Sequence, residues 1–297
     1  MKFGLFIVLL LLFTVSPVTA VQRSVLSYES ILFTSDRTGS WNIFRKILTT
    51  GEVVNLTNNA HNNMNPQLSP DKRSVVFYSD RDGINQIYRM DLASKSVTRL
   101  THTQSHEYDP QYSPNGKFIV FKSNLDDGYG DIWLMNADSS GRKNLTKSLR
   151  STEEWIPTFS KDGTKIYFVS GLLQYSEILI MDSRMGDAAP FYALTHNTVP
   201  DWYPSVNPVN GEILVISRAP GSSSDSLYTI SKNGQKRTKI SSLPDDSDDP
   251  SWSADGKKIA FINSRTGKYD IYTMNANGSN IQLIEDSSNN ELSPIFL

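Results

Sequence analysis

Carboxylates are concentrated in the segments that precede a recurring proline of this sequence. Asp245, Asp246, Asp248 and Asp249 all lie within five residues, directly before Pro250. Their summed negative field would attract a cationic partner and raise its rate of encounter. The corresponding segments elsewhere hold further candidate partner-binding acids, namely Glu107, Asp109, Glu153, Glu154 and Asp201. Acids in loops also keep an exposed surface soluble, so these residues are compatible with partner binding and with solubility alone.

Two tryptophans accompany these acids. Trp155 follows Glu154 and Trp202 follows Asp201, each shortly before a recurring proline. An exposed indole ring can stack on a sugar or cover an apolar side chain of a partner, while a buried one fills a core. The two residues are therefore candidates for the same binding surface or for structural wedges.

One local cluster could ligate a metal ion. His102, His106 and Glu107 supply imidazole and carboxylate groups, which are common zinc ligands. Their spacing matches no recognised metal-binding pattern, so the cluster is a weak candidate. We expect that the protein binds no cofactor. The alternative is a divalent cation bound at the mouth of a channel through the protein.

Motifs of the common catalytic sites are absent from the sequence. Gly221-Ser222-Ser223-Ser224-Asp225 begins like a serine nucleophile elbow, but the closing glycine is missing. The sequence has no glycine-rich phosphate loop, no His-Glu-x-x-His motif and no cysteine. These observations favour a binding protein over an enzyme.

The elements that must position these residues follow from an internal repeat. A proline recurs at intervals of 44 to 47 residues, at Pro66, Pro110, Pro157, Pro204, Pro250 and Pro294. Most copies continue with a turn rich in Asp, Asn and Gly, and then with a short apolar run such as Val75-Val76-Phe77. A second apolar pair and a closing pair such as Leu56-Thr57 complete four predicted strands. Four short antiparallel strands in each of six repeats predict an all-β, six-bladed β-propeller.

The two ends of the sequence predict how the ring closes. The first apolar run is Ile31-Leu32-Phe33, whereas the last strand that follows a proline is Ile295-Phe296-Leu297 at the C-terminus. An unpaired sheet edge would remain unless these two strands met. We therefore predict that the C-terminal strand completes the first blade.

The repeats resemble the WD-like repeat of the TolB propeller family. The clearest copy begins with Pro250-Ser251-Trp252-Ser253-Ala254-Asp255-Gly256-Lys257 and continues with Asp270-Ile271-Tyr272-Thr273-Met274-Asn275. Gly130-Asp131-Ile132-Trp133-Leu134-Met135-Asn136 repeats it, and the resemblance covers residues 28–297. It implies a six-bladed propeller. TolB-like propellers include periplasmic binding proteins of the Tol–Pal system, non-catalytic halves of oligopeptidases and some sugar-polymer lyases.

The resemblance has one departure. TolB carries an α/β domain before its propeller, and this sequence leaves no room for one. The binding of TolA, which is linked to that region, is therefore not expected here. A contact made by the propeller itself, to a lipoprotein or another envelope protein, is what the resemblance implies.

The N-terminus is typical of a signal peptide. Lys2 precedes an apolar run from Phe3 to Phe13, and Val18-Thr19-Ala20 offers small residues for cleavage. The run is shorter than the ~20 residues of a membrane span. We predict a signal peptide over residues 1–20, a single propeller domain over residues 21–297 and no transmembrane segment after cleavage. Without cysteine the exported protein is not a lipoprotein, which leaves a periplasmic or secreted location.

The placement of charge suggests which face would bind. In a propeller, the loops from the fourth strand of one blade to the first strand of the next surround one channel mouth, and the acids fall in these loops. The formal net charge of −2 offers no basic surface for nucleic acid. We therefore predict a monomeric, non-enzymatic scaffold that docks an envelope partner at the channel face. The alternatives are a polysaccharide-acting enzyme at the mouth, as a lyase or a metal-assisted hydrolase, and a sensor of a small ligand or sugar.

A first prediction concerns stability. Because the chain has no cysteine, no disulfide restrains its unfolded state. The thermal unfolding midpoint should therefore be the same with and without dithiothreitol, as measured by scanning calorimetry. A reproducible shift on adding the reductant would contradict this expectation.

Overall fold

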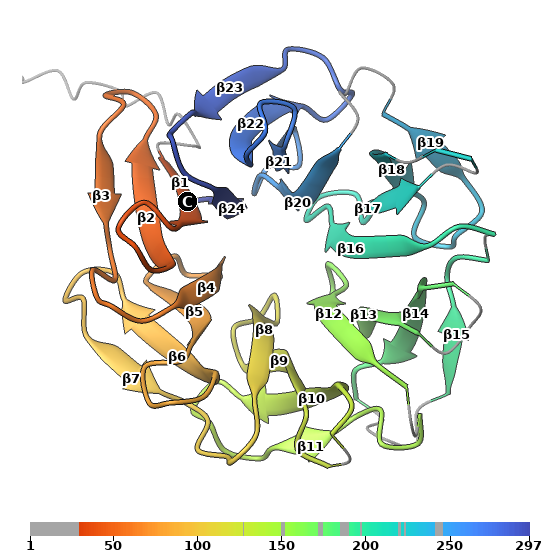
Figure 1. Ribbon diagram of the computed structural model, residues 1–297. Coiled ribbons are helices and arrows are strands. Elements are labelled where there is room, and N and C mark those ends of the chain that lie inside the picture. The colour runs from red at the N-terminus through yellow and green to blue at the C-terminus, as the bar shows by residue number, and fades with distance from the viewer. Residues whose placement is uncertain are drawn as a thin grey trace, which may run out of the picture.

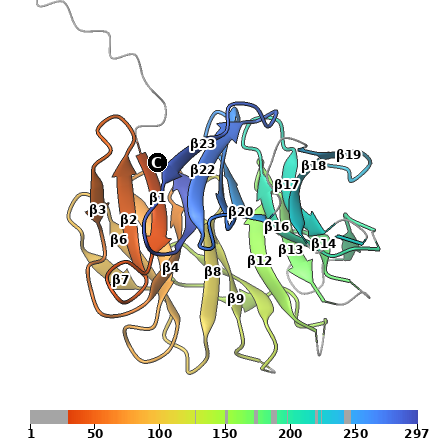
Figure 2. The ribbon, with the colours of Figure 1, turned by 45° about the horizontal axis from the view of Figure 1, so that its top comes forward.

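The fold is a ring of six four-stranded antiparallel sheets around a central axis (Figure 1). The computed structural model describes residues 30–126, 128–149, 152–171, 175–184, 190–196, 198–218, 221–222, 224–240 and 246–297. The predicted signal peptide, residues 1–20, lies outside this part of the chain. Figure 2 shows the same ring tilted, with the blades side by side around the axis. No described helix is long and apolar enough to cross a membrane.

Each blade is named here from the axis outward. The first consists of β24 (Glu291–Phe296), β1 (Ser30–Ser35), β2 (Asn42–Ile47) and β3 (Val53–Asn55). The second holds β4 (Asn63–Leu68), β5 (Ser74–Ser79), β6 (Gln86–Asp91) and β7 (Val97–Arg99). The third holds β8 (Glu107–Tyr112), β9 (Phe118–Ser123), β10 (Asp131–Asn136) and β11 (Lys143–Asn144). The fourth holds β12 (Glu154–Phe159), β13 (Lys165–Ser170), β14 (Glu177–Asp182) and β15 (Phe191–Ala193). The fifth holds β16 (Asp201–Val206), β17 (Ile213–Arg218), β18 (Asp225–Ile230) and β19 (Arg237–Lys239). The sixth holds β20 (Ser247–Trp252), β21 (Lys258–Asn263), β22 (Asp270–Asn275) and β23 (Gln282–Glu285).

The predicted closure of the ring is confirmed. Strand β24 pairs antiparallel with β1, with Ile31 opposite Phe296 and Leu32 opposite Ile295. The backbone N–H of Leu297 donates to the carbonyl of Ser30 at 3.0 Å. In Figure 1 the C-terminus accordingly lies inside the ring, next to β1. The first blade is thus assembled from both ends of the chain.

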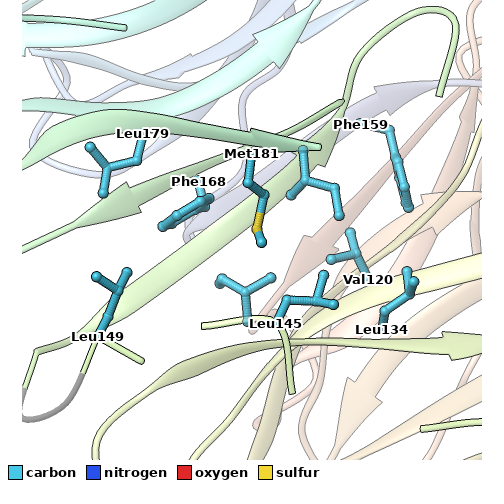
Figure 3. Packing of buried hydrophobic residues seen from close by; sticks show 10 residues of the cluster. Val120, Leu134, Leu145, Leu149, Phe159, Phe168, Leu179 and Met181 are labelled. Carbon is cyan, nitrogen blue, oxygen red and sulfur yellow. The ribbon is translucent and has the colours of Figure 1, made fainter. Parts of the chain in front are cut away.

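Hydrophobic packing lies between neighbouring blades. Figure 3 shows one such layer, in which Val120 and Leu134 of the third blade meet Phe159, Phe168 and Leu179 of the fourth. Both faces of the second strand in each blade are covered in this way. This explains why those strands are continuous apolar runs without polar alternation.

The repeated Leu-Thr pairs close the outer strands. The hydroxyls of Thr57, Thr101, Thr146 and Thr195 accept the backbone N–H of Ile43, Ile87, Ile132 and Ile178, at 2.9–3.0 Å. The preceding leucines are buried and donate their own N–H groups to the carbonyls of the same isoleucines. One short motif therefore supplies both a core side chain and the hydrogen bonds that hold the fourth strand.

Within the paired stretch, every inner strand has one residue more than the second strand opposite it. In β4, for example, Met64 lies opposite Tyr78 and Gln67 opposite Val76, so an extra residue bulges between them. The residue directly before each recurring proline has a left-handed φ of 50–52°, at Asn65, Asp109, Ile156, Tyr203, Asp249 and Ser293. Such a conformation is rare for a β-branched residue such as Ile156. The bulge is thus imposed by the fold in all six blades, whatever side chain stands there.

A second prediction tests the closure. Deleting residues 293–297 removes the buried side chains of Ile295 and Phe296, a loss of about 3–6 kcal/mol of burial free energy. It also exposes the edge of β1. The truncated protein should therefore melt many degrees lower in calorimetry, whereas deletion of Leu297 alone should have a small effect. A truncated protein that melts within a degree or two of the full chain would disprove the role of this pairing.

Candidate functional site

Three cavities follow one another along the axis of the ring. The largest, about 940 Å³, opens at one end, a narrow one of about 90 Å³ lies in the middle, and one of about 400 Å³ lies at the other end. The first two share only the residues before the recurring prolines, which we call the throat ring: Asn65, Asp109, Ile156, Tyr203, Asp249 and Ser293. The throat ring therefore forms the floor of the large cavity, which we call the mouth cavity.

The walls of the mouth cavity come from fixed positions of the repeat. The residue two before each proline contributes to them in all six blades, and we call these residues the wall ring: Met64, Tyr108, Trp155, Trp202, Asp248 and Leu292. Residues that follow the apolar runs of the second strands also line the cavity, among them Tyr78 and Lys122. The loops between the second and third strands add Asn124 and Tyr269. Repeat position alone thus brings these side chains together.

The wall and throat rings together have an aromatic part and an acidic part. Aromatic side chains lie side by side in the third, fourth and fifth blades, as Tyr108, Trp155, Trp202 and Tyr203. The sixth blade contributes two carboxylates, Asp248 and Asp249, and the third adds Asp109. The predicted residues Asp109, Trp155, Trp202, Asp248 and Asp249 therefore do meet in one place, with Glu153 at its edge.

Ion pairs neutralise the edge of the cavity and leave the floor acidic. Lys122 Nζ lies 2.9 Å from Glu153, and Arg218 binds Asp225 through two contacts of 3.0 Å. Both cations also lie over mouth aromatics, Lys122 at 5.6 Å from the Tyr108 ring centre and Arg218 at 5.6 Å from that of Trp202. No described lysine or arginine forms such a pair with Asp109, Asp248 or Asp249. Among the described residues, these three carboxylates therefore have no ion-pair partner.

Burial governs how these carboxyl groups titrate. Burial, with the neighbouring Asp249 carboxylate, raises the pKa of Asp248 to about 7. Burial, with the Asp109 carboxylate, raises the pKa of Asp249 to about 6. The pKa of Asp109 is also raised by burial, although hydrogen bonding from Asn65 and the positive charge of Lys122 act in the opposite direction. A cation entering the cavity would stabilise the ionised forms.

Hydrogen bonds link the throat ring across several blades. Asn65 donates from its side-chain amide to Asp109 at 2.6 Å, and its amide oxygen accepts the Ser293 hydroxyl at 2.6 Å. The backbone N–H of Ser293 in turn donates to Asp249 at 2.7 Å. The carboxylates at the floor are therefore held in place by neutral donors before any ligand binds.

Three predicted acids lie elsewhere than expected. Glu107, Glu154 and Asp201 are fully buried, because each is the first residue of an inner strand and not part of an exposed loop. Asp201 binds Arg237 through contacts of 2.9 and 3.0 Å, and Glu107 accepts from Arg142 at 3.2 Å. In the structure these three side chains are buried, do not line the mouth cavity and join strands within a blade.

The remaining predicted residues do not contribute to the cavity. Asp246 is exposed outside it, and Asp245 lies outside the described residues. The metal cluster of His102, His106 and Glu107 is not formed, since no group of three potential ligands converges anywhere in the described ranges. The Glu107 carboxylate points to buried partners, whereas His106 is exposed and stacks on Tyr108 at 5.9 Å.

Several lining residues were not anticipated from the sequence. Tyr78, Tyr108, Tyr203, Lys122 and Arg218 all border the mouth cavity. Aligning the six repeats on the proline would have found Tyr108 and Tyr203, because every residue one or two places before it faces the cavity. The same alignment would have shown that Tyr78 and Lys122 directly follow an apolar run.

Comparison with known proteins identifies the family. The family model of the TolB beta propeller domain matches residues 27–150 and 155–297. TolB from Acinetobacter baumannii superposes with a TM-score of 0.78 at 17% identity, over 90% of this chain and 66% of that chain. A putative TolB from Agrobacterium tumefaciens gives 0.69 at 19% identity, over 88% and 90% of the two chains. An oligogalacturonate lyase from Vibrio parahaemolyticus gives 0.59 at 12% identity, over 88% and 75%.

The two kinds of comparison carry different weight. At these identities the solved structures establish the fold alone, and this chain spans just under two thirds of the length of the Acinetobacter TolB. The family model, by contrast, matches nearly all the residues from 27 to the C-terminus. With its six blades and its repeats matched in this way, the chain belongs to the TolB β-propeller family.

Proposed function

We propose that this protein is a non-enzymatic binding platform, exported to the periplasm or beyond, which docks a partner protein of the cell envelope at the mouth cavity. One observation carries the proposal. Asp109, Asp248 and Asp249 line a cavity with aromatic walls, and no described lysine or arginine forms an ion pair with them. Elsewhere on this face, buried acids such as Asp201 and Glu291 are paired with an arginine of the chain.

The chemistry of the cavity favours a partner segment that carries a cation beside an apolar group. The carboxylates of the sixth blade would bind a lysine or arginine side chain, and aromatic faces attract the same cations. The protein already uses this arrangement, because Lys122 and Arg218 each combine a carboxylate with an aromatic ring. The aromatic sector of the third to fifth blades would then cover the apolar part of the segment.

The size and construction of the cavity also suit docking. A volume of about 940 Å³ lies at the upper end of the range of ligand pockets, so it accommodates several side chains of a polypeptide. Its wall ring and throat ring stand on the six inner β-strands, and rigid elements hold a binding surface at a low entropic cost. The signal peptide predicted for residues 1–20 supports an exported location and hence an envelope partner.

A third prediction follows from the two carboxylates of the sixth blade that line the mouth cavity. In the double variant Asp248→Asn/Asp249→Asn, association with a partner captured from envelope extracts should be at least about fivefold slower at low salt, because the attracting field is weakened. The salt dependence of the rate should also become flatter. The partner is captured on the wild-type protein, identified by mass spectrometry and purified, and rates are measured by surface plasmon resonance.

The matched control is Glu52→Gln/Glu212→Gln, which removes two negative charges from turns at the opposite end of the blades. It should leave the association rate nearly unchanged, because these residues do not border the mouth cavity. If both double variants slowed association equally, the effect would come from the net charge of the protein and not from the position of the carboxylates. Loss of binding only after Lys72→Gln/Lys257→Gln would place the docking surface on the opposite face and refute the proposal.

A further inference from the structure

Glu154 differs from the equivalent residues of the other blades. Each inner strand begins with a buried polar side chain, and in four blades an arginine binds it: Arg37 binds Glu291, Arg81 binds Asn63, Arg142 binds Glu107 and Arg237 binds Asp201. The sixth blade has the neutral Ser247 at this position. Among the described residues, Glu154 of the fourth blade is the acid at this position that no cation contacts.

The sequence of the fourth blade has no arginine at the two positions that supply it in the other blades. Arg37 and Arg81 stand two residues after the serine that ends the second strand of their blades, and Leu172 has this place after Ser170. Arg237 begins the outer strand β19 opposite Ile230, whereas Phe191 begins β15 opposite the equivalent Met181. Apolar residues therefore stand at both sequence positions that supply the arginine in other blades.

The hydrogen bonds around Glu154 fit a neutral carboxyl group. Its Oε1 atom lies 2.6 Å from the Thr152 hydroxyl and 3.0 Å from that of Ser170, while Oε2 is buried without a hydrogen-bond partner. The Thr152 hydroxyl has a single proton and also lies 2.6 Å from the carbonyl of Leu149. One proton cannot serve both oxygens, so a proton on the Glu154 carboxyl group would supply the second hydrogen bond.

The charged groups around Glu154 oppose its ionisation. Asp131 of β10 and the adjacent Glu153 both contribute negative charge, and Lys122 of β9 is engaged by Glu153 at 2.9 Å. Burial, followed by these two carboxylates, raises the pKa of Glu154 to about 7, although the Thr152 and Ser170 hydroxyls act in the opposite direction. Ionisation therefore places an uncompensated charge at the start of β12.

This strand delivers two residues to the mouth cavity, Trp155 to the wall ring and Ile156 to the throat ring. Its start is held by the Glu154 N–H, which donates to the carbonyl of Gly130 at 2.7 Å, and by the Gly171 N–H, which donates to that of Glu153 at 3.0 Å. We propose that Glu154 is a proton-dependent strut of the mouth cavity: protonated, it holds the start of β12 and Trp155 in place, and ionised, it loosens both. A role of Glu154 in controlling docking rests on the proposed function. The titration of Glu154 itself does not depend on a partner.

The sign of the pH effect follows from linkage. The pKa of Glu154 is raised from the ordinary value of 4.5 to about 7 in the folded protein, so between these limits the folded state holds the extra proton. Its contribution to stability is complete below pH 4.5 and is lost as the pH rises through 7. Glu154→Gln cannot ionise and should therefore melt at least about 3 °C above the wild type at pH 8, with nearly equal melting at pH 5.

The matched control is Asp201→Asn, which stands at the same position of the fifth blade but removes an ion pair with Arg237. It should melt below the wild type at pH 8, the opposite sign to Glu154→Gln. A Glu154→Gln protein that melts below the wild type at pH 8 by a similar amount would show an ordinary structural acid and overturn the proposal.

Tryptophan fluorescence tests the link to the mouth cavity without a partner. The wild-type emission should change with a midpoint near pH 7, and this change should be absent from Trp155→Phe and from Glu154→Gln. Asp248 also titrates with a pKa of about 7, so Asp248→Asn must retain the transition. Phe191→Arg, which supplies the missing cation, should move the midpoint down by at least about one pH unit.

Three outcomes would overturn the strut: no transition in the wild type, a transition retained in Glu154→Gln, or one abolished by Asp248→Asn. None of these measurements depends on a captured partner. A failed docking experiment with an intact Glu154 transition would therefore refute the proposed function and leave the titration standing.

Discussion

The mouth cavity depends on one extra residue in each inner strand. In a regular strand, successive side chains point to opposite faces of the sheet. Here Trp155 and Ile156, or Asp248 and Asp249, are successive residues that line the same cavity, because the bulge before the proline turns the second of them toward the axis. Bulges commonly aim side chains at functional sites. In this protein the device is repeated around the ring, and it doubles the number of side chains that six strands present to the cavity.

The fold could be predicted from the sequence because its determinants are local and repeated. The prolines, the apolar runs and the Leu-Thr pairs each correspond to a fixed contact within a blade, as the hydrogen bonds of Thr101 and Thr146 show. The closing pair β24–β1 could be inferred as well, since one unmatched strand remained at each end. Such contacts can be predicted without knowing which residues meet across the ring.

The candidate site could be predicted only in part. Asp109, Asp248, Asp249 and the two tryptophans were found because they stand next to the prolines. The burial of Glu107 and Asp201 could not be seen, because it depends on Arg142 and Arg237, each about 35 residues away in the sequence. Nor does composition show that Lys122 and Arg218 neutralise the edge of the cavity. Pairing of charges between strands, and not their number, decides where the negative field remains.

The way in which the ring is closed also sets its response to mechanical force. The two strands of the closing pair are antiparallel, and Ser30 and Leu297 lie at the same end of it. Tension applied between these two residues would therefore load the hydrogen bonds of the pair one after another, as in unzipping, and not all together, as in shear. The closing pair thus yields more easily to a pull between these two residues than to a pull from opposite ends of its strands.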